Sequence, residues 1–448
     1  MTDRLAPLTE ALLAAATKAG AEAADAIAVD GTALSVDVRG GRLEQAERAE
    51  GIEIGLRVLI AKRQACVSAS DISERTIAEM AERAVAMARE APEDPSLGLA
   101  DPGELASAWD LAALDLADPA AEPAAAMLED DARRAEAAAL AVKGVSQVQS
   151  ASASYSHRRL HLAATNGFAG GYARTSRSTS AVAITGEGLR MERDWAAESR
   201  VYQSDLPSPE EIGRLAGERA VARAGARKPK TGAYPVVFDE RISAGLIGHL
   251  LGAINGSAIV RGASWLRDAM GEQVLPRGLS VFENPHRPRI TGSRPFDAEG
   301  LPTEARDIVR DGVLQTWTLD LGTARRLGLK STASASRGTS SPPSPSASNI
   351  ALTQGDKSRD QLLEEIGTGL LVTSMIGSSI NPTTGDYSRG ASGFWVENGQ
   401  LAYPVNECTI AGNLREMLLR ITPANDARAH LSHVVPSLLV EGLTLAGE

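Results

Sequence analysis

The sequence predicts an α+β fold, with an α/β N-terminal part built from two α-β-β-β-α units and an antiparallel β-rich C-terminal domain with peripheral helices. Two observations support the N-terminal part: helical spacing alternates with strand-like segments, and this order occurs twice along the chain. A third observation, the hairpin signals beyond residue 232, supports the β-rich part. Because 448 residues are many for one domain, we expect three domains: residues 1–95, 108–226 and 232–448.

The first unit begins and ends with a helix. Apolar residues recur at helical spacing over residues 5–19 and again over residues 72–89, where Asp71 is the expected N-cap. Alternating segments between these helices predict strands at residues 24–29, 34–38 and 52–70. Gly40-Gly41 marks a turn between two of them.

The second unit has the same order. Helices are expected at residues 123–142 and 210–224, the latter with Ser208 as its N-cap and Pro209 at its first position. The predicted strands between them are residues 145–156, 159–164 and 168–185, with a turn at Asn166-Gly167.

Beyond residue 232 the pattern changes. Residues 234–238 predict a strand and residues 244–259 a helix. Asp311-Gly312 and Asn398-Gly399 each separate two apolar runs, and such pairs favour the positive φ angles of a tight hairpin turn. Residues 331–349 are rich in Ser and Pro, which is typical either of a disordered loop or of a loop that faces a substrate.

Composition limits the classes of function. The formal net charge is −11, and nucleic acids and anionic membranes attract clustered positive charge, so we expect no direct contact with either. The densest basic stretch, residues 223–230, is expected to be an exposed linker. Two cysteines, no signal-peptide core and no apolar run near ~20 residues indicate a cytoplasmic protein.

The familiar catalytic motifs are missing from the sequence. It has no P-loop, no Rossmann glycine fingerprint, no CxxC and no G-x-S-x-G elbow. The pairs His157/His161 and His430/His433 fall in strand or loop patterns without the Cys, His or Glu neighbours of a zinc site. The residues alone therefore indicate no catalytic site.

Three segments nevertheless carry a resemblance. They read GLIGHLLGA at residues 245–253, TGDYSRGASGFWVENG at residues 384–399 and TIAGNL at residues 409–414. Through them, and over essentially its whole length, the chain resembles the TldD/PmbA family of TldD/TldE metallopeptidases. The segment at residues 384–399 is similar to a signature of the PmbA (TldE) branch.

The resemblance has consequences for metal binding. Catalytic members of the TldD branch carry an H-E-x-x-x-H motif and a late cysteine, with the glutamate activating a zinc-bound water. Here the first His position is Ala244, the Glu position is Gly245, and only His249 remains, while no cysteine follows Cys408. The resemblance thus implies a degenerate motif, with no metal and no catalytic residue in this chain and zinc in a TldD-like partner.

The expected function follows from this resemblance. It implies a PmbA/TldE-like subunit of a cytosolic TldD/TldE-type zinc metallopeptidase, which processes flexible peptides together with a TldD-like catalytic subunit. The candidate substrate-binding residues are His249, Asp386, Tyr387 and Arg389. The alternatives are a non-enzymatic peptide-binding or chaperone-like module, and a self-sufficient hydrolase with an unrecognised site. A homodimer of the isolated chain stays open.

Overall fold

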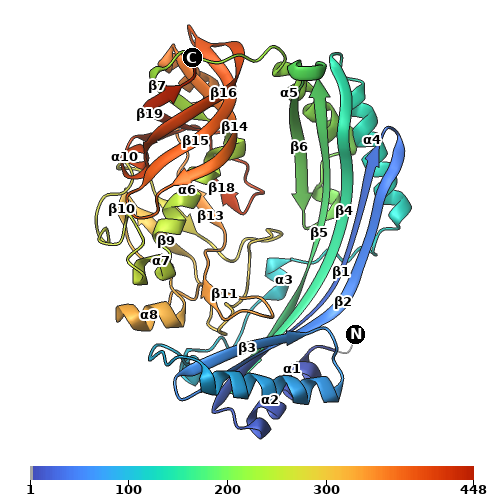
Figure 1. The fold of residues 1–448 in the computed structure, drawn as a ribbon, viewed down its shortest axis with the longest axis vertical. Helices are drawn as coiled ribbons and strands as arrows, with labels where there is room; N and C mark the ends of the chain where they lie inside the picture. The colour runs from blue at the N-terminus through green and yellow to red at the C-terminus, as the bar shows by residue number, and fades with distance from the viewer. Residues whose placement is uncertain (1–3) are drawn as a thin grey trace.

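The computed structural model describes residues 4–448, apart from the side chain of Ser378, so residues 1–3 of the first expected domain lie outside the described residues. It confirms the α+β class. Figure 1 shows a long, curved N-terminal sheet on one side of the molecule and a C-terminal half on the other. In the described part of the chain, no helix is long and apolar enough to cross a membrane.

The first unit has the predicted α-β-β-β-α order. Its elements are α1 (Ala6–Ala19), β1 (Ala23–Arg39), β2 (Arg42–Ile60), β3 (Arg63–Ala69) and α2 (Glu74–Glu90). Two strand predictions were wrong in their limits. Residues 24–29 and 34–38 form one strand, because Gly31 pairs with Gly51 and continues the ladder. Residues 52–70 are divided by a turn in which Ala61 and Lys62 both have positive φ.

The N-cap prediction for α2 was also wrong. Ser73, not Asp71, caps the helix, because the Ser73 side chain accepts a hydrogen bond from the backbone N–H of Thr76 at 3.3 Å. Asp71 instead accepts a hydrogen bond from the backbone N–H of Ser73 at 3.0 Å. The aspartate therefore orders the residue that caps the helix.

The second unit repeats the order. Its elements are α4 (Ala125–Leu140), β4 (Val145–Ala164), β5 (Ala169–Thr185), β6 (Glu192–Arg200) and α5 (Pro209–Ala222). Ser208 caps α5 as predicted. Residues 145–156 and 159–164 are one strand and not two, and β6 was not predicted at all. The intervening segments contain short helical turns at Pro102–Glu104, Leu111–Leu114 (α3), Gly188–Arg190 and Gln203–Asp205.

One sheet spans both units, in the order β3-β2-β1-β4-β5-β6. The units join where β1 pairs with β4, from Asp25↔Ala164 to Val38↔Ala151. Helices α4 and α5 cover one face near β4, β5 and β6, whereas α1 and α2 pack at the other end. The opposite, concave face of the long strands is turned toward the C-terminal half (Figure 1). The domain limits themselves stay a prediction.

The C-terminal half is built on a closed barrel. Its strands are β7 (Gly232–Phe238), β14 (Gly369–Ile380), β15 (Asp386–Glu397), β16 (Gln400–Asn413) and β19 (Leu438–Ala446), with β17 (Ile421–Pro423) at the side. Pairing of β16 with β19 closes the barrel. The pairs are antiparallel except β7 with β14. Both predicted hairpin turns are confirmed, with φ of 48° at Asp311 and 51° at Asn398.

The helix predicted over residues 244–259 is two helices. They are α6 (Glu240–Ala253) and α7 (Gly256–Val260). The chain leaves the helical path at Ile254, and the Asn255 side chain then caps α7 by accepting from the backbone N–H of Ser257 at 3.0 Å. Leu246, Ile247 and Leu250 anchor α6 in the core of this half.

A second, smaller sheet and short helices complete this half. The sheet has the order β10 (Val313–Leu314), β9 (Arg306–Arg310), β8 (Val281–Glu283), β13 (Ile350–Leu352) and β18 (His433–Val434). The helices are α8 (Leu321–Leu327), α9 (Arg359–Ile366) and α10 (Leu414–Leu418). The basic stretch at residues 223–230 crosses between the halves, and it is not wholly exposed, because Arg223 is buried against Glu192 and Asp194.

The Ser/Pro-rich segment, residues 331–349, is packed rather than disordered. It contains the short pair β11 (Ala335–Ser336) and β12 (Ser344–Pro345). Arg337 is buried and forms an ion pair with Asp25 of β1. Thr339 approaches β2 so closely that a Cβ atom on Gly55 would lie 2.1 Å from the Thr339 carbonyl oxygen. The segment thus fastens the C-terminal half to the N-terminal sheet.

Candidate functional site

Three cavities form a row between the concave face of the N-terminal sheet and the C-terminal half. The upper cavity, of about 920 Å³, lies between β5 and β6 on one side and β14, β15 and β16 on the other. The middle cavity, of about 430 Å³, lies between β5, β6 and residues 428–432. The lower cavity, of about 310 Å³, reaches residues 335–337. Trp195 lines the first two, and Thr291 lines the last two, so we call the row the interdomain groove.

The upper cavity has a mixed polar and apolar lining beside a free strand edge. Strand β6 is the last of its sheet, and its outer edge has no strand partner among residues 4–448. Three large apolar side chains that line this cavity are exposed: Met191 by 47%, Trp195 by 49% and Ile376 by 76%. A free edge can pair with an extended peptide backbone, and neighbouring apolar side chains can contact its residues.

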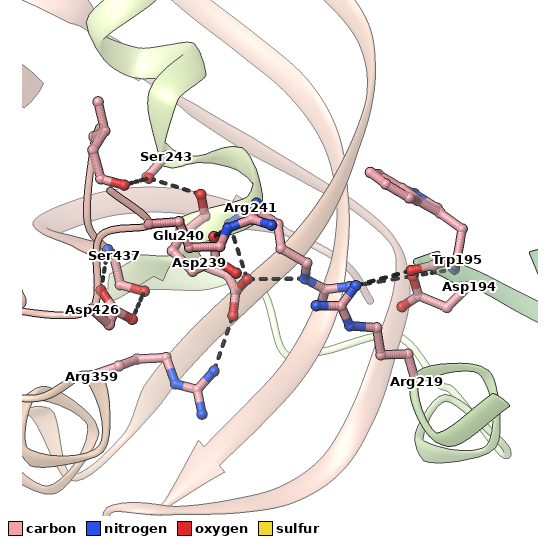
Figure 2. A network of polar contacts seen from close by, with 12 residues as sticks. Asp194, Trp195, Arg219, Asp239, Glu240, Arg241, Ser243, Arg359, Asp426 and Ser437 are labelled. Atoms are coloured by element: carbon pink, nitrogen blue, oxygen red, sulfur yellow. Dashed lines mark hydrogen bonds and ion pairs between the residues drawn. The ribbon is translucent and has the colours of Figure 1, made fainter. Parts of the chain in front are cut away.

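Buried charges join the two halves beside the groove, as Figure 2 shows. Asp239 caps α6 by accepting from the backbone N–H of Arg241 at 3.2 Å, and it also accepts from Arg241 Nε at 3.0 Å. Arg241 Nη1 lies 3.3 Å from Asp194 Oδ1 on β6. Arg359 Nη1 donates to Asp239 Oδ2 at 3.1 Å. These pairs fix the first turn of α6 against the edge strand.

A second pair of contacts extends this network. Arg428 lies 2.6 Å from Glu240 on α6 and 3.2 Å from Glu198 on β6. Burial raises the pKa of Glu240, and the positive charge of Arg428 opposes that shift. Figure 2 also shows Ser437 beside Asp426, to which its hydroxyl donates at 2.7 Å. Ionic contacts with Asp194 on β6, with Arg359 on α9 and with Arg428 therefore hold the start of α6 in place.

Three of the four predicted binding residues lie together. The rings of His249 on α6 and Tyr387 on β15 are 5.8 Å apart and meet edge to face. Burial, and then the charge of Arg389, lower the pKa of His249, and burial raises the pKa of Tyr387 to about 12. Arg389 Nε donates to the carbonyl oxygen of Gly377 at 2.7 Å.

Asp386 is separate from these three. It is exposed, and it accepts from Thr384 Oγ1 at 2.6 Å and from Asn413 Nδ2 at 3.1 Å. Both hydrogen bonds lower the pKa of the Asp386 carboxyl group, and the bond from Thr384 has the larger effect. Within the described residues, none of the four predicted side chains lines the interdomain groove, and their role in substrate binding stays a prediction.

Comparison with protein families accounts for almost the whole chain. Residues 24–88 match PmbA/TldA metallopeptidase domain 1, residues 112–224 match the central domain, and residues 231–447 match the C-terminal domain. The chain belongs to the PmbA/TldD metallopeptidase family. The first two of these matches divide the strands of the N-terminal sheet, with β1 to β3 in domain 1 and β4 to β6 in the central domain.

Individual relatives place this PmbA/TldD chain in the PmbA (TldE) branch. It is 38% identical to Metalloprotease PmbA of Escherichia coli O157:H7, over 93% of this chain and 90% of that one. It is 36% identical to the Metalloprotease PmbA homolog of Haemophilus influenzae, over 96% and 94% of the two chains.

Solved structures agree with the fold. The crystal structure of a putative modulator of DNA gyrase from Bacteroides thetaiotaomicron superposes with a TM-score of 0.92 at 27% identity, over 100% of both chains. TldE from Thermococcus kodakarensis superposes with a TM-score of 0.85 at 19% identity, over 98% of this chain and 100% of that one. The second likeness concerns the fold alone.

The residues of this PmbA-branch chain do not fit a zinc site at the motif position. Ala244, Gly245 and His249 supply a methyl group, a hydrogen atom and one imidazole. Helix α6 is an uninterrupted α-helix, in which positions five apart differ by about 140° in direction. Among residues 4–448, no three His, Cys, Asp or Glu side chains lie close enough together to hold a metal ion.

Cys408 is not available as a ligand either. It lies inside β16. Its buried thiol donates to the carbonyl oxygen of Ala391 at 3.2 Å, and burial raises its pKa to about 11. A thiol with so high a pKa is mostly protonated near neutral pH, and the protonated form is a poor metal ligand.

The interdomain groove was not predicted from the sequence. Strand β6 has charged residues on both faces, so its pattern did not indicate a strand. The signal that could have revealed it is Trp195, a large aromatic side chain within the charged stretch Glu192–Arg200. An exposed tryptophan in such a setting is typical of a binding surface.

Proposed function

We propose that this chain is the non-catalytic subunit of a cytoplasmic TldD/TldE-type zinc metallopeptidase that acts on flexible peptides. A TldD-like partner would hold the zinc and supply the water that attacks the peptide bond. The observation that carries the proposal is the donor set on α6, where Ala244 and Gly245 replace a ligand and a general base while the family fold is retained.

The role of this chain is then to bind and orient the peptide. Apart from Trp195, whose backbone N–H and C=O are bound by the side chains of Asp194 and Arg219, the free edge of β6 offers backbone hydrogen bonds, which are independent of the peptide's sequence. Met191, Trp195 and Ile376 offer apolar contact in the upper cavity. Hydrogen bonds to the peptide backbone do not depend on its side chains. Such binding suits a subunit whose substrates are all flexible but have different sequences.

Helix α6 also offers a surface for the partner. Its glycines Gly245, Gly248 and Gly252 are spaced so that they lie on neighbouring turns, and a Cβ atom on any of them would meet nothing within 4 Å in this chain. No contact within the chain therefore requires glycine there. A partner backbone that packs closely against the helix would require it.

The test uses the purified chain, alone and with a TldD-like chain from the same genome. Alone, we expect less than stoichiometric zinc by elemental analysis and no hydrolysis of a flexible peptide. With the partner, we expect a stable complex, one zinc per pair and hydrolysis that a chelator abolishes. A partner whose zinc-binding histidines are replaced by alanine is the control, and its complex should form but not cleave.

Each alternative predicts a different outcome. Stoichiometric zinc and chelator-sensitive activity in the isolated chain would contradict the proposal. Hydrolysis by the isolated chain that survives chelation would instead identify a self-sufficient hydrolase. Peptide binding without hydrolysis, with the partner absent from the complex, would identify a peptide-binding or chaperone-like module.

A further inference from the structure

The middle cavity of the interdomain groove is lined by cationic side chains. Five arginines and one histidine face it: Arg200, Arg219, Arg241, Arg289, Arg428 and His430. Among the residues that line it, Glu198 is the only carboxylate in the described part of the chain. This cationic lining contrasts with the net charge of −11 of the whole chain.

Four of the five arginines are paired with carboxylates of this chain. Arg200 and Arg428 both lie within 3.2 Å of Glu198. Arg289 Nε lies 2.7 Å from Asp115. Arg241 pairs with Asp194 and Asp239, as described above. The positive charge of these four is therefore largely balanced within the protein.

Arg219 is the exception. It extends from α5 toward Arg241 and Asp194 (Figure 2), yet no carboxylate of residues 4–448 lies within 4.0 Å of its guanidinium group. Its Nη1 donates to the backbone carbonyl oxygen of Trp195 at 3.1 Å. The pKa of Arg219 is lowered mainly by burial and, to a smaller extent, by the like charge of Arg241. The charges of Asp194, Asp239 and Glu240 oppose that shift from farther away. A half-buried guanidinium group without a direct ion pair is further stabilised by an anion that enters the cavity.

We propose that the middle cavity binds a carboxylate group of a peptide that lies in the interdomain groove, with Arg219 as the principal ligand. This rests on the proposed function, because the peptide is the one that the groove would hold. A planar guanidinium group matches a carboxylate through two parallel hydrogen bonds. The hydroxyl groups of Ser178, Ser180 and Ser199, which line the same cavity, can donate further hydrogen bonds.

The position of the cavity supports a peptide as the source of the carboxylate. Trp195 lines both this cavity and the upper one, so a peptide that follows β6 would pass from a section with exposed Met191 and Ile376 into a cationic section. A volume of about 430 Å³ exceeds what a carboxylate alone fills and leaves room for the residue that carries it. The carboxylate comes either from the peptide's C-terminus or from an Asp or Glu side chain.

The experiment compares short, flexible Gly/Ser-rich peptides that carry a fluorophore at the N-terminus. Four versions combine internal Glu or Gln with a free or an amidated C-terminus. Binding to the purified full chain is measured by fluorescence anisotropy at low salt. We expect removal of the recognised carboxylate to weaken binding on the order of tenfold to 100-fold. The version that loses affinity tells a C-terminal carboxylate from a side-chain carboxylate.

Matched variants test the assignment to Arg219. Arg219→Gln should weaken binding of the carboxylate peptide by the same factor and leave the neutral, amidated peptide unaffected. Arg219→Lys should retain part of the affinity, because it keeps the charge but not the two-pronged geometry. Arg214→Gln is the control, since Arg214 is exposed on the same helix and pairs with Glu218 at 2.7 Å. Circular dichroism checks that each variant is folded.

The outcomes separate this inference from the proposed function. If all four peptides bind equally and Arg219→Gln changes nothing, the inference is overturned while peptide binding stands. If binding depends on the carboxylate but not on Arg219, the carboxylate binds elsewhere and the inference is overturned. If none of the four peptides binds to the chain, with or without its TldD-like partner, the proposed function fails and the inference fails with it.

Discussion

The two places where the N-terminal sheet meets the C-terminal half are built in opposite ways. At the lower contact, residues 331–349 pack directly on β1 and β2, and the ion pairs among Asp25, Arg57 and Arg337 are buried. At the upper contact, β6 and α6 are joined by charged side chains, with open cavities on either side. The difference indicates that the lower contact fixes the two halves, whereas the upper contact positions a surface for ligands.

The largest expected effect lies at the lower contact. Asp25→Ala leaves the buried guanidinium groups of Arg57 and Arg337 without their carboxylate, and removal of one partner of a buried ion pair costs about 3–5 kcal/mol. The free energy of unfolding, measured by urea denaturation, should fall by that amount. Arg310→Ala is the control, because its ion pair with Asp307 is largely exposed and worth at most about 1 kcal/mol. Equal losses in both variants would contradict a fixed lower contact.

A smaller effect concerns pH at the same contact. Burial, and then the nearby charge of Asp297, raise the pKa of Glu299 from 4.5 to about 8. Between these two values the folded chain binds more protons than the unfolded chain, so stability from this group falls as pH rises, by at most about 1.4 kcal/mol per pH unit. Glu299→Gln should remove that slope in urea denaturation between pH 6 and pH 8. Parallel slopes for the variant and the parent chain would show that Glu299 is not buried in this way.

The smallest expected effect is a gain in stability at α6. Gly245→Ala adds a methyl group where nothing lies within 4 Å, and this exchange in a helix stabilises by about 0.5–1 kcal/mol. Thermal unfolding measures the gain. At the lower contact, Gly55→Ala should have the opposite sign, because its Cβ would lie 2.1 Å from the Thr339 carbonyl oxygen. Should both changes stabilise, the contrast between the contacts would not hold.

Local signals in the sequence predicted the fold well wherever local chemistry determines it. Ser208 and Pro209 determine where α5 begins. Asp311-Gly312 and Asn398-Gly399 determine their hairpins through positive φ. The turn at Ala61-Lys62 could not be predicted, because neither residue is typical of positive φ.

Long-range pairing accounts for the remaining errors in the fold. Strands β1 and β4 continue through segments that looked like interruptions, because each is paired with the other and with a further neighbour along its length. Closure of the barrel depends on β16 and β19, which nothing in the sequence brings together. Strand β6 forms on β5 despite its charged residues.

The candidate site was predicted only in part for a related reason. Tyr387 and Arg389 are two residues apart on β15, so they share a face and meet His249, whereas Asp386 points to the other face. The interdomain groove could not be predicted, because its lining comes from β5, β6, the barrel and residues 428–432. Only the tertiary structure brings those segments together.

The ladder between β1 and β4 also determines how this protein can be divided. The family models separate residues 24–88 from residues 112–224, yet the backbone hydrogen bonds from Asp25↔Ala164 to Val38↔Ala151 cross that boundary. A fragment holding only one of these units would present a long, unpaired strand edge to solvent, and such edges promote aggregation. For expression and crystallisation, we therefore expect the two sequence-defined domains to require each other.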